Sequence, residues 1–273
     1  MTTIVCFHAH PDDECIATGG TMARAAAAGH RVVLVVATRG ERGEPTPGVL
    51  SDGEGLWERR LAETYEAAQV LGAARVEFLG YVDSGMMGEP TNSSPYSFWS
   101  IPVDHAATRL AAILTEEDAD VLTIYDDHGG YGHPDHIQVH RVGLRAAELA
   151  GTPKVFQSTM NRDQIRRSVE LYEQAEPEED RDAALAARAE RLAELDSFGT
   201  PEALITHAID VSDLVGTKRE AMLAHRSQIA DDSWFLMMQP ESFLSAFGTE
   251  WYIETGATRA EGEPFATTLW DPA

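Results

Sequence analysis

The chain has 273 residues, of which 45 are acidic and 21 basic, so its formal charge is −24. Apolar residues make up 43% of it, which is typical of a globular protein with a sizeable core. The acidic balance argues against nucleic acids and anionic membranes as partners, because both bind basic faces. A first strand beginning at residue 3 leaves no room for a signal peptide, and no apolar run approaches ~20 residues. We therefore expect a soluble, cytoplasmic protein.

Two cysteines, Cys6 and Cys15, are too few for a disulfide framework. Cys15 follows an acidic turn, which leaves three interpretations open: a metal ligand, a reactive thiol or a small packed residue. We favour packing, because a buried cysteine usually behaves as a small hydrophobe.

The first 160 residues alternate apolar strands with amphipathic helices. The expected strands are Thr3–His8, Arg31–Thr38, Arg75–Leu79, Asp120–Tyr125 and Lys154–Ser158. The expected helices are Glu14–Ala28, Leu56–Leu71, Val103–Glu116 and His133–Ala150, with long loops over 39–55 and 80–102. This alternation predicts an α/β fold whose Rossmann-like, doubly wound parallel sheet has the strand order 3-2-1-4-5.

Residues 161–273 are less regular. We expect them to form a helical and irregular C-terminal part that packs on the 1–160 core within a single domain and lines the pocket. The acid-rich stretch 161–198 predicts a solvated helical excursion, with a partner-binding arm as the less favoured alternative. Further expectations are a sixth strand at Leu204–Val211, a helix from Ser212 or Asp213 to about Ile229, and an aromatic-rich loop over Asp231–Ile253.

Two turns with similar sequences follow the first and fourth strands. Residues 10–14 read HPDDE, and residues 133–136 read HPDH. In the order 3-2-1-4-5 these two strands are neighbours, and the switch point of the sheet lies between them. The two turns are therefore predicted to face one another and to form one site.

The residue types in these turns are suited to binding a metal ion. His10, Asp13 and one histidine of the second turn, for which His136 is the better placed, make a set of three ligands. Three protein ligands with an open position are typical of a catalytic ion, and nitrogen with carboxylate oxygen suits Zn²⁺ or Fe²⁺. A water in the open position would have its pKa lowered towards neutrality.

Four neighbouring side chains are candidates for the catalytic steps. Asp12 lies beside the ligands and can take a proton from the water. His133 can act as a general acid or stabilise an oxyanion, and Tyr131 can donate its phenolic hydrogen to the same charge. Asp135 is suited to fixing the tautomer of a histidine.

Simpler interpretations exist for each turn. Pro11 and Pro134 are suited to the first position of a helix, where the helix dipole also favours acids. That explains one turn but not the occurrence of His-Pro-Asp in both. His8 is expected to pack or hydrogen-bond. Asp127, His128 and His140 are expected at the surface.

Three functional classes are alternatives to a hydrolase that uses one metal-activated water. A phosphoester hydrolase with two metals usually needs more carboxylates. A non-catalytic metal-binding or ligand-binding protein needs neither Asp12 nor His133. A nucleotide-dependent oxidoreductase needs a glycine-rich turn after the first strand, where this chain has HPDDE.

The two motifs together resemble the PIG-L/LmbE family of metal-dependent N-deacetylases. The likeness is supported by residues 40–44 (GERGE), 60–63 (RLAE), 81–86 (YVDSGM) and 225–228 (HRSQ). It is strong over 1–157 and fainter over 204–253, and it is nearest to the mycothiol-pathway deacetylase and conjugate-amidase branch. One departure is Ala17, where that branch tends to have a polar residue or lysine.

The resemblance implies Zn²⁺ held by His10, Asp13 and His136. It implies Asp12 as general base, His133 as acid or oxyanion stabiliser, and Tyr131 near the scissile carbonyl. It makes Arg60 and Asp83 candidates for binding sugar hydroxyls or a phosphate. The implied substrate is a small amino-sugar conjugate that loses an N-acyl group, commonly acetyl. A homo-oligomer is compatible with this picture.

Overall fold

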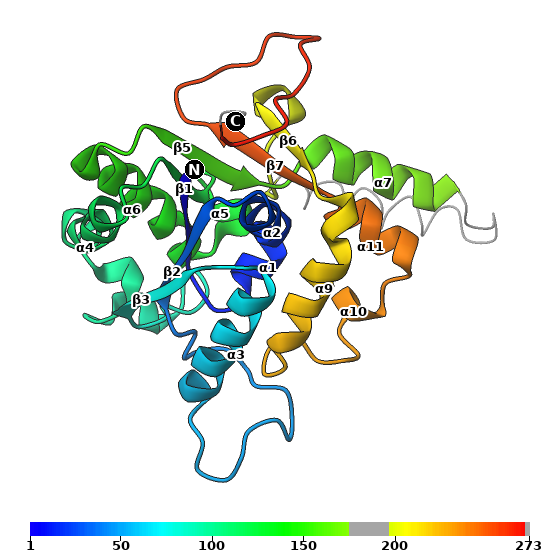
Figure 1. Ribbon diagram of the computed structural model, residues 1–273. Coiled ribbons are helices and arrows are strands. Elements are labelled where there is room, and N and C mark those ends of the chain that lie inside the picture. The colour runs from blue at the N-terminus through cyan, green and yellow to red at the C-terminus, as the bar shows by residue number, and fades with distance from the viewer. Residues whose placement is uncertain (175–196, 271–273) are drawn as a thin grey trace.

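Strand β1 (Thr3–His8) lies inside the sheet between two parallel neighbours, and all six of its residues are buried. The computed structural model describes residues 1–174 and 197–270. In these ranges the strands form one sheet in the order β3-β2-β1-β4-β5-β7-β6 (Figure 1). The other strands are β2 (Arg31–Thr38), β3 (Arg75–Tyr81), β4 (Val121–Tyr125), β5 (Lys154–Thr159), β6 (His207–Asp210) and β7 (Thr249–Glu254).

Helices cover both faces of this sheet (Figure 1). Alternate residues of a strand point to opposite faces, so Ile4 and Cys6 join one apolar cluster while Val5 and Phe7 join the other. The helices are α1 (Asp13–Ala17), α2 (Gly19–Ala27), α3 (Leu56–Val70), α4 (Val103–Glu116), α5 (Gly129–Gly132), α6 (Pro134–Ala150), α7 (Arg162–Gln174), α9 (Val215–Ala224), α10 (Trp234–Met237) and α11 (Pro240–Phe247). On one face α9 packs on α1, α2 and α3, and on the other α4 packs on α6.

The predicted strand order 3-2-1-4-5 is confirmed, and β1 pairs in parallel with both β2 and β4. The α/β fold class is confirmed with it. The sheet is nevertheless mixed, because β7 pairs antiparallel with β5 and with β6. The expectation of a loop over Asp231–Ile253 is wrong, because this stretch holds α10, α11 and most of β7.

The single helix expected over Glu14–Ala28 is also wrong, because Thr18 divides it into α1 and α2. The backbone of Thr18 is non-helical, and its hydroxyl lies 2.8 Å from His8 Nε2. A new helix begins directly after it, because the Glu250 carboxylate accepts hydrogen bonds of 2.8 Å from the N–H groups of Gly20 and Thr21. Lys218 Nζ lies 2.6 Å from the same buried carboxylate.

Smaller differences concern the ends of elements. The strand expected to end at Leu79 continues to Tyr81, and the helix expected to reach Ile229 ends at Ala224. The sixth strand, His207–Asp210, is shorter than expected. The acid-rich stretch 161–198 begins as α7, and its residues 175–196 lie outside the described ranges. Each helix within those ranges is too short or too polar to cross a bilayer.

Candidate active site

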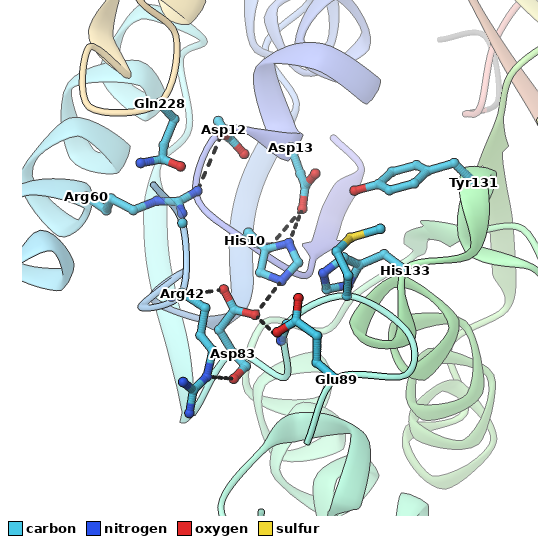
Figure 2. Close-up of a pocket in the computed structure, with 13 residues that line it drawn as sticks. His10, Asp12, Asp13, Arg42, Arg60, Asp83, Glu89, Tyr131, His133 and Gln228 are labelled. Carbon is cyan, nitrogen blue, oxygen red and sulfur yellow. Dashed lines mark hydrogen bonds and ion pairs between the residues drawn. The ribbon is translucent and has the colours of Figure 1, made fainter. Parts of the chain in front are cut away.

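The turns after β1 and β4 meet at the carboxyl edge of the sheet, as the strand order predicts. The ring of His10 lies 4.6 Å from that of His133 and 5.4 Å from that of His136, measured between centroids. Gly129 allows this approach, since its φ is +68° and a Cβ there would lie 2.6 Å from the Cβ of His136. Figure 2 shows the side chains of both turns directed into one pocket.

Asp13 joins the two histidines. Its Oδ2 lies 3.4 Å from His10 Nδ1 and 3.4 Å from His136 Nε2. Ligand atoms around a tetrahedral zinc ion are separated by roughly 3.3–3.5 Å, given bonds of about 2.0–2.1 Å. His136 Nε2 is buried and has no hydrogen-bond partner among the described residues. The three predicted ligands therefore fit a metal ion that would bind this nitrogen.

His133 is close enough to be considered as an alternative ligand, because its ring nitrogen groups with those of His10 and His136 within 4.8 Å. Its Nδ1 accepts a hydrogen bond of 3.1 Å from the backbone N–H of Asp135. The neutral ring must therefore carry its proton on Nε2. Burial, together with His10 and His136, lowers the pKa of His133 to about 4, so the neutral ring is the stable form.

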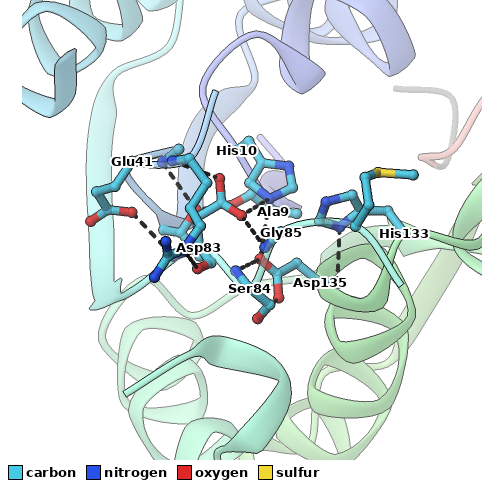
Figure 3. A network of polar contacts seen from close by, with 12 residues as sticks. Ala9, His10, Glu41, Asp83, Ser84, Gly85, His133 and Asp135 are labelled. Carbon is cyan, nitrogen blue, oxygen red and sulfur yellow. Dashed lines mark hydrogen bonds and ion pairs between the residues drawn. The ribbon is translucent and has the colours of Figure 1, made fainter. Parts of the chain in front are cut away.

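The side chain of Asp135 orients His10, whereas its backbone N–H contacts His133. The fully buried carboxylate accepts hydrogen bonds from the backbone N–H and hydroxyl of Ser84, and its Oδ2 lies 3.2 Å from His10 Nε2 (Figure 3). With Nε2–H donated to Asp135, the Nδ1 atom of His10 faces Asp13 and would give up its proton to a metal ion bound there. The prediction that Asp135 fixes a histidine tautomer thus has a structural basis, in the other turn.

Negative charge surrounds His10. Burial disfavours a charged ring, but the hydrogen bonds to Asp13 and Asp135 and the charge of Asp83 outweigh it and raise the pKa of His10 well above its ordinary value. Burial alone would raise the pKa of Asp13, yet the neighbouring His136 and His10 lower it well below its usual range. A site with this balance favours a bound cation, which displaces protons from its ligands.

Asp12 lies next to the three ligands and lines the cavity with them. It has an unusual backbone, with φ at +99° and ψ at −28°. Burial raises the pKa of its carboxyl to about 6, against the opposing effect of the Arg60 guanidinium. A carboxylate with a pKa near the working pH is suited to proton transfer.

The cavity has a volume of about 290 Å³, which is at the small end for ligand sites. Its lining residues are His10, Asp12, Asp13, Arg42, Gly43, Arg60, Asp83, Gly85, Met86, Glu89, Tyr131, His133 and Gln228. Tyr131 points its hydroxyl towards Asp13 from the opposite wall (Figure 2). Burial, followed by the charge of Asp13, raises the pKa of Tyr131, so the phenol keeps its proton. Among the described residues, Gln228 alone of the C-terminal part lines this cavity, and none of 231–253 does.

The two predicted substrate-binding residues differ in how far their polar atoms are already used in hydrogen bonds within the protein. Asp83 accepts hydrogen bonds from the backbone N–H groups of Arg42 and Gly85 and still faces the cavity. Arg60 is 3% exposed, and its two terminal nitrogens donate to the carbonyl oxygens of Gly40 and Pro11. Its guanidinium is thus largely used within the protein.

Several expectations about single residues are also resolved. His8 packs and hydrogen-bonds as expected, to the Tyr125 hydroxyl and to Thr18. Cys15 is buried and its thiol lies 2.9 Å from the backbone oxygen of Asp12. His140, expected at the surface, is half-buried and hydrogen-bonds the Tyr125 carbonyl.

Sequence reasoning missed the functions of Ser84, Glu14 and His225 in this region. Ser84 holds Asp135, while His225 Nε2 lies 2.6 Å from Glu14 Oε1. The available signal was the likeness of residues 81–86 and 225–228 to a known family, which marks these positions without pairing them.

Comparisons with known proteins identify the family. Residues 5–147 match the PIG-L family, described as GlcNAc-PI de-N-acetylase. A Thermobifida fusca (strain YX) protein named 1D-myo-inositol 2-acetamido-2-deoxy-alpha-D-glucopyranoside deacetylase is 45% identical over 246 residues, which cover 83% of each chain. A Catenulispora acidiphila protein, whose name is the same with the number 1 added, is 38% identical over 271 residues, 91% of this chain and 82% of the relative. The chain therefore belongs to the PIG-L family. Its class is that of hydrolases acting on C–N amide bonds.

Solved structures confirm the fold. An N,N'-diacetylchitobiose deacetylase from Pyrococcus horikoshii matches with a TM-score of 0.60 at 20% identity, over 93% of this chain and 84% of the other. GalB, a 4-carboxy-2-hydroxymuconate hydratase from Pseudomonas putida KT2440, matches with a TM-score of 0.56 at 16% identity, over 96% and 99%. Because a hydratase shares the fold, the reaction has to be argued from the site itself.

Proposed function

We propose that this protein is a zinc-dependent deacetylase that removes the N-acetyl group from a glucosamine–inositol conjugate. The observation that carries the proposal is the position of Asp12 in the cavity, next to the buried group of His10, Asp13 and His136. A site that only binds a metal ion needs no more than the three ligands. A hydrolase also needs a carboxylate that can accept the proton of the attacking water.

Five side chains at the site would have separate functions in the reaction. His10, Asp13 and His136 would hold the ion, and Asp135 would keep His10 in the tautomer that leaves Nδ1 free. When bound, zinc would supply Lewis acidity to the water and to the amide carbonyl. Asp12 would take the proton from the water as its oxygen adds to the carbonyl carbon.

The neutral ring of His133 would donate its Nε2–H to the amide oxygen, with the Tyr131 hydroxyl as a second donor on the same wall. Breaking the C–N bond releases acetate and a free amine. The proton held by Asp12 is then available for the amine nitrogen, so the reaction balances with one water consumed.

Two observations favour an amide over a phosphoester. The carboxylates of Asp83 and Asp135 accept hydrogen bonds from protein N–H groups, which leaves few free carboxylates for a second metal ion. The relatives named above are deacetylases of a glucosamine–inositol conjugate, at up to 45% identity. A non-catalytic function would leave the position of Asp12 in the cavity unexplained.

The polar groups on the cavity wall fit a sugar. Asp83, Arg42 and Gln228 all line the cavity, and they offer both acceptors and donors for hydroxyl groups. Arg60, whose terminal nitrogens are used by backbone carbonyls, is better suited to shaping this wall than to binding sugar.

The test is release of free amine from four substrates: the glucosamine–inositol conjugate in the names of the relatives, N-acetylglucosamine, N,N'-diacetylchitobiose and a thiol-conjugate amide. Each is assayed in native protein, after chelation, and after zinc or ferrous iron is added back. We expect chelator-sensitive release that is fastest with the inositol conjugate. No release from any substrate by protein containing one equivalent of metal would contradict the proposal.

A further inference from the structure

The peptide group between Pro11 and Asp12 is held at both ends by buried charged side chains. Its N–H, on Asp12, donates a hydrogen bond of 3.0 Å to Glu14 Oε2. Its carbonyl oxygen, on Pro11, accepts a hydrogen bond from Arg60 Nη2. The orientation of this peptide sets the direction in which the Asp12 side chain leaves the backbone.

Glu14 is in turn held by a residue from the far end of the chain. Its other oxygen, Oε1, lies 2.6 Å from Nε2 of His225, which follows helix α9. Glu14 and His225 are both fully buried, and neither lines the cavity. Their hydrogen-bonded connection to the reacting groups runs through the backbone N–H of Asp12.

This support coincides with backbone strain. A φ of +99° is uncommon for any residue other than glycine and is retained only where surrounding contacts enforce it. Glu14 and Arg60 contact the Pro11–Asp12 peptide, and the Asp12 carbonyl oxygen accepts hydrogen bonds from the backbone N–H groups of Cys15 and Ile16. The same Arg60 Nη2 also lies 3.4 Å from Asp12 Oδ2, as Figure 2 shows.

We propose that Glu14 and His225 are positioning residues, which fix the Pro11–Asp12 peptide so that the carboxylate of Asp12 faces the cavity. The inference rests on the proposed function, in which Asp12 accepts a proton. Arg60 belongs to the same arrangement, since Nη1 donates to the Gly40 carbonyl and Nη2 to the Pro11 carbonyl.

The contact between His225 and Glu14 has a second feature that points to this function. The other ring nitrogen, His225 Nδ1, is buried and has no hydrogen-bond partner within residues 1–174 and 197–270. The polar contact of the His225 ring is therefore the one to Glu14. In another buried ion pair, Lys218 with Glu250, the carboxylate accepts hydrogen bonds from the N–H groups of Gly20 and Thr21 in α2, so the two pairs support different parts of the fold.

The first experiment compares His225→Gln with His225→Leu. The amide N–H of glutamine can still reach Glu14, whereas leucine removes the donor. The kinetics with the glucosamine–inositol conjugate are measured together with zinc content by mass spectrometry. We expect His225→Leu to lower kcat by about 10- to 100-fold, the size of effect that misplacement of a catalytic group produces. KM and the one equivalent of zinc should be unchanged, and His225→Gln should keep most of the activity.

His207→Gln is the matched control. This histidine is also buried, but it lies on β6 away from the cavity. Its kcat should equal that of the native protein. If His225→Leu has native kcat, or if glutamine and leucine lower kcat equally, the positioning function is wrong.

A second experiment repeats His225→Leu in an Asp12→Asn background. Asparagine tolerates a positive φ, so the backbone at this position can be kept. If His225 acts through Asp12, the removal of His225 should cause no further fall in kcat in this background. If His225→Leu lowers kcat in this background by the same factor as in the native protein, His225 supports the fold in general, which overturns the inference.

These results separate the two proposals. Native activity in Asp12→Asn alone would refute the proposed proton acceptor. Loss in Asp12→Asn with none in His225→Leu would refute only the positioning function. If His225→Leu does not fold, Glu14→Asp replaces it, because the shorter side chain withdraws from the Asp12 N–H while keeping its charge near His225. A similar fall in kcat with zinc retained supports the inference, and native kcat overturns it.

Discussion

Tyr125 lies flat against His136, with ring centroids 4.3 Å apart and 10° between the ring planes. Its hydroxyl reaches His8 Nδ1 at 2.8 Å, and the other nitrogen of His8 reaches Thr18. A candidate metal ligand is thus held in place by the last residue of β4, which in turn is held by the last residue of β1. The carboxyl edge of the sheet therefore fixes the orientation of this candidate ligand.

Replacing Tyr125 should separate stacking from hydrogen bonding. Tyr125→Phe keeps the stacked ring but leaves His8 Nδ1 buried without its partner, which should lower the free energy of unfolding by about 1–3 kcal/mol. Zinc affinity should stay near native. Tyr125→Leu also removes the stack, and we expect zinc to bind about 10- to 100-fold more weakly, as for other supports of metal ligands. Competition with a chromogenic chelator measures this affinity, and equal affinities in the two variants would rule out the supporting function.

His136→Ala should abolish stoichiometric zinc binding. One of three ligands is lost, and the two that remain are fewer than the three protein ligands typical of a catalytic zinc site. Zinc per chain is measured after dialysis, with the exposed His105 changed to alanine as the control. One equivalent of zinc in His136→Ala would show that another group, His133 for example, completes the ligand set.

His133→Gln and His133→Ala should differ in activity. Since Nδ1 of His133 accepts a backbone N–H, the ring presents Nε2–H to the cavity, and glutamine can place an N–H near the same position. We expect kcat to fall by about 10²–10³-fold in the alanine variant, the usual cost of losing an oxyanion donor, and by clearly less in the glutamine variant. Zinc content serves as the control. Equal losses would instead make His133 a proton donor in the reaction.

Stability in acid should depend on Glu117. Hydrogen bonds from Arg31 and Arg75 lower the pKa of this carboxyl to about 2. Because the pKa is lower in the folded state, the stabilisation is complete above the unfolded pKa and is lost as the pH falls from about 4.5 towards 2. Glu117→Gln should therefore lower the free energy of unfolding at pH 7 by about 1–2 kcal/mol, a value reduced for the solvent exposure of Arg31.

The difference between native protein and Glu117→Gln should narrow as the pH falls from about 4.5 to 3, and it would close only towards pH 2. Urea unfolding at four pH values from 7 to 3 measures it, with the exposed Glu66→Gln as the control. A difference that is constant with pH would mean that the ion pairs do not change the titration of Glu117.

The sequence predicts the part of the fold that follows local rules. Buried strands alternate with helices over 1–160, and right-handed crossovers then leave few strand orders, so the meeting of His10 with His136 follows from topology. The pairing of β7 with β5 does not follow in this way. It joins residues about a hundred positions apart, and Thr249–Glu254 carries no alternation that distinguishes it from a loop.

The same limit applies inside the site. Asp12 and Asp13 are adjacent, so their closeness to His10 is visible in the sequence. The partner of Glu14 is 211 positions away, and no spacing rule connects it to His225. Arg60, a candidate for substrate binding, lines the cavity, but the carbonyl oxygens that accept its hydrogen bonds are set by backbone geometry, which the sequence does not display.

The distance along the chain between Glu14 and His225 has a consequence for synthesis. A growing polypeptide can bring His10, Asp13 and His136 together as soon as α6 has been made. The contact that steadies Asp12 cannot form until the segment after α9 has left the ribosome and packed against α1. On the proposed function, the three candidate ligands would therefore meet before the contact that positions Asp12 can form, and full turnover would wait for the segment after α9.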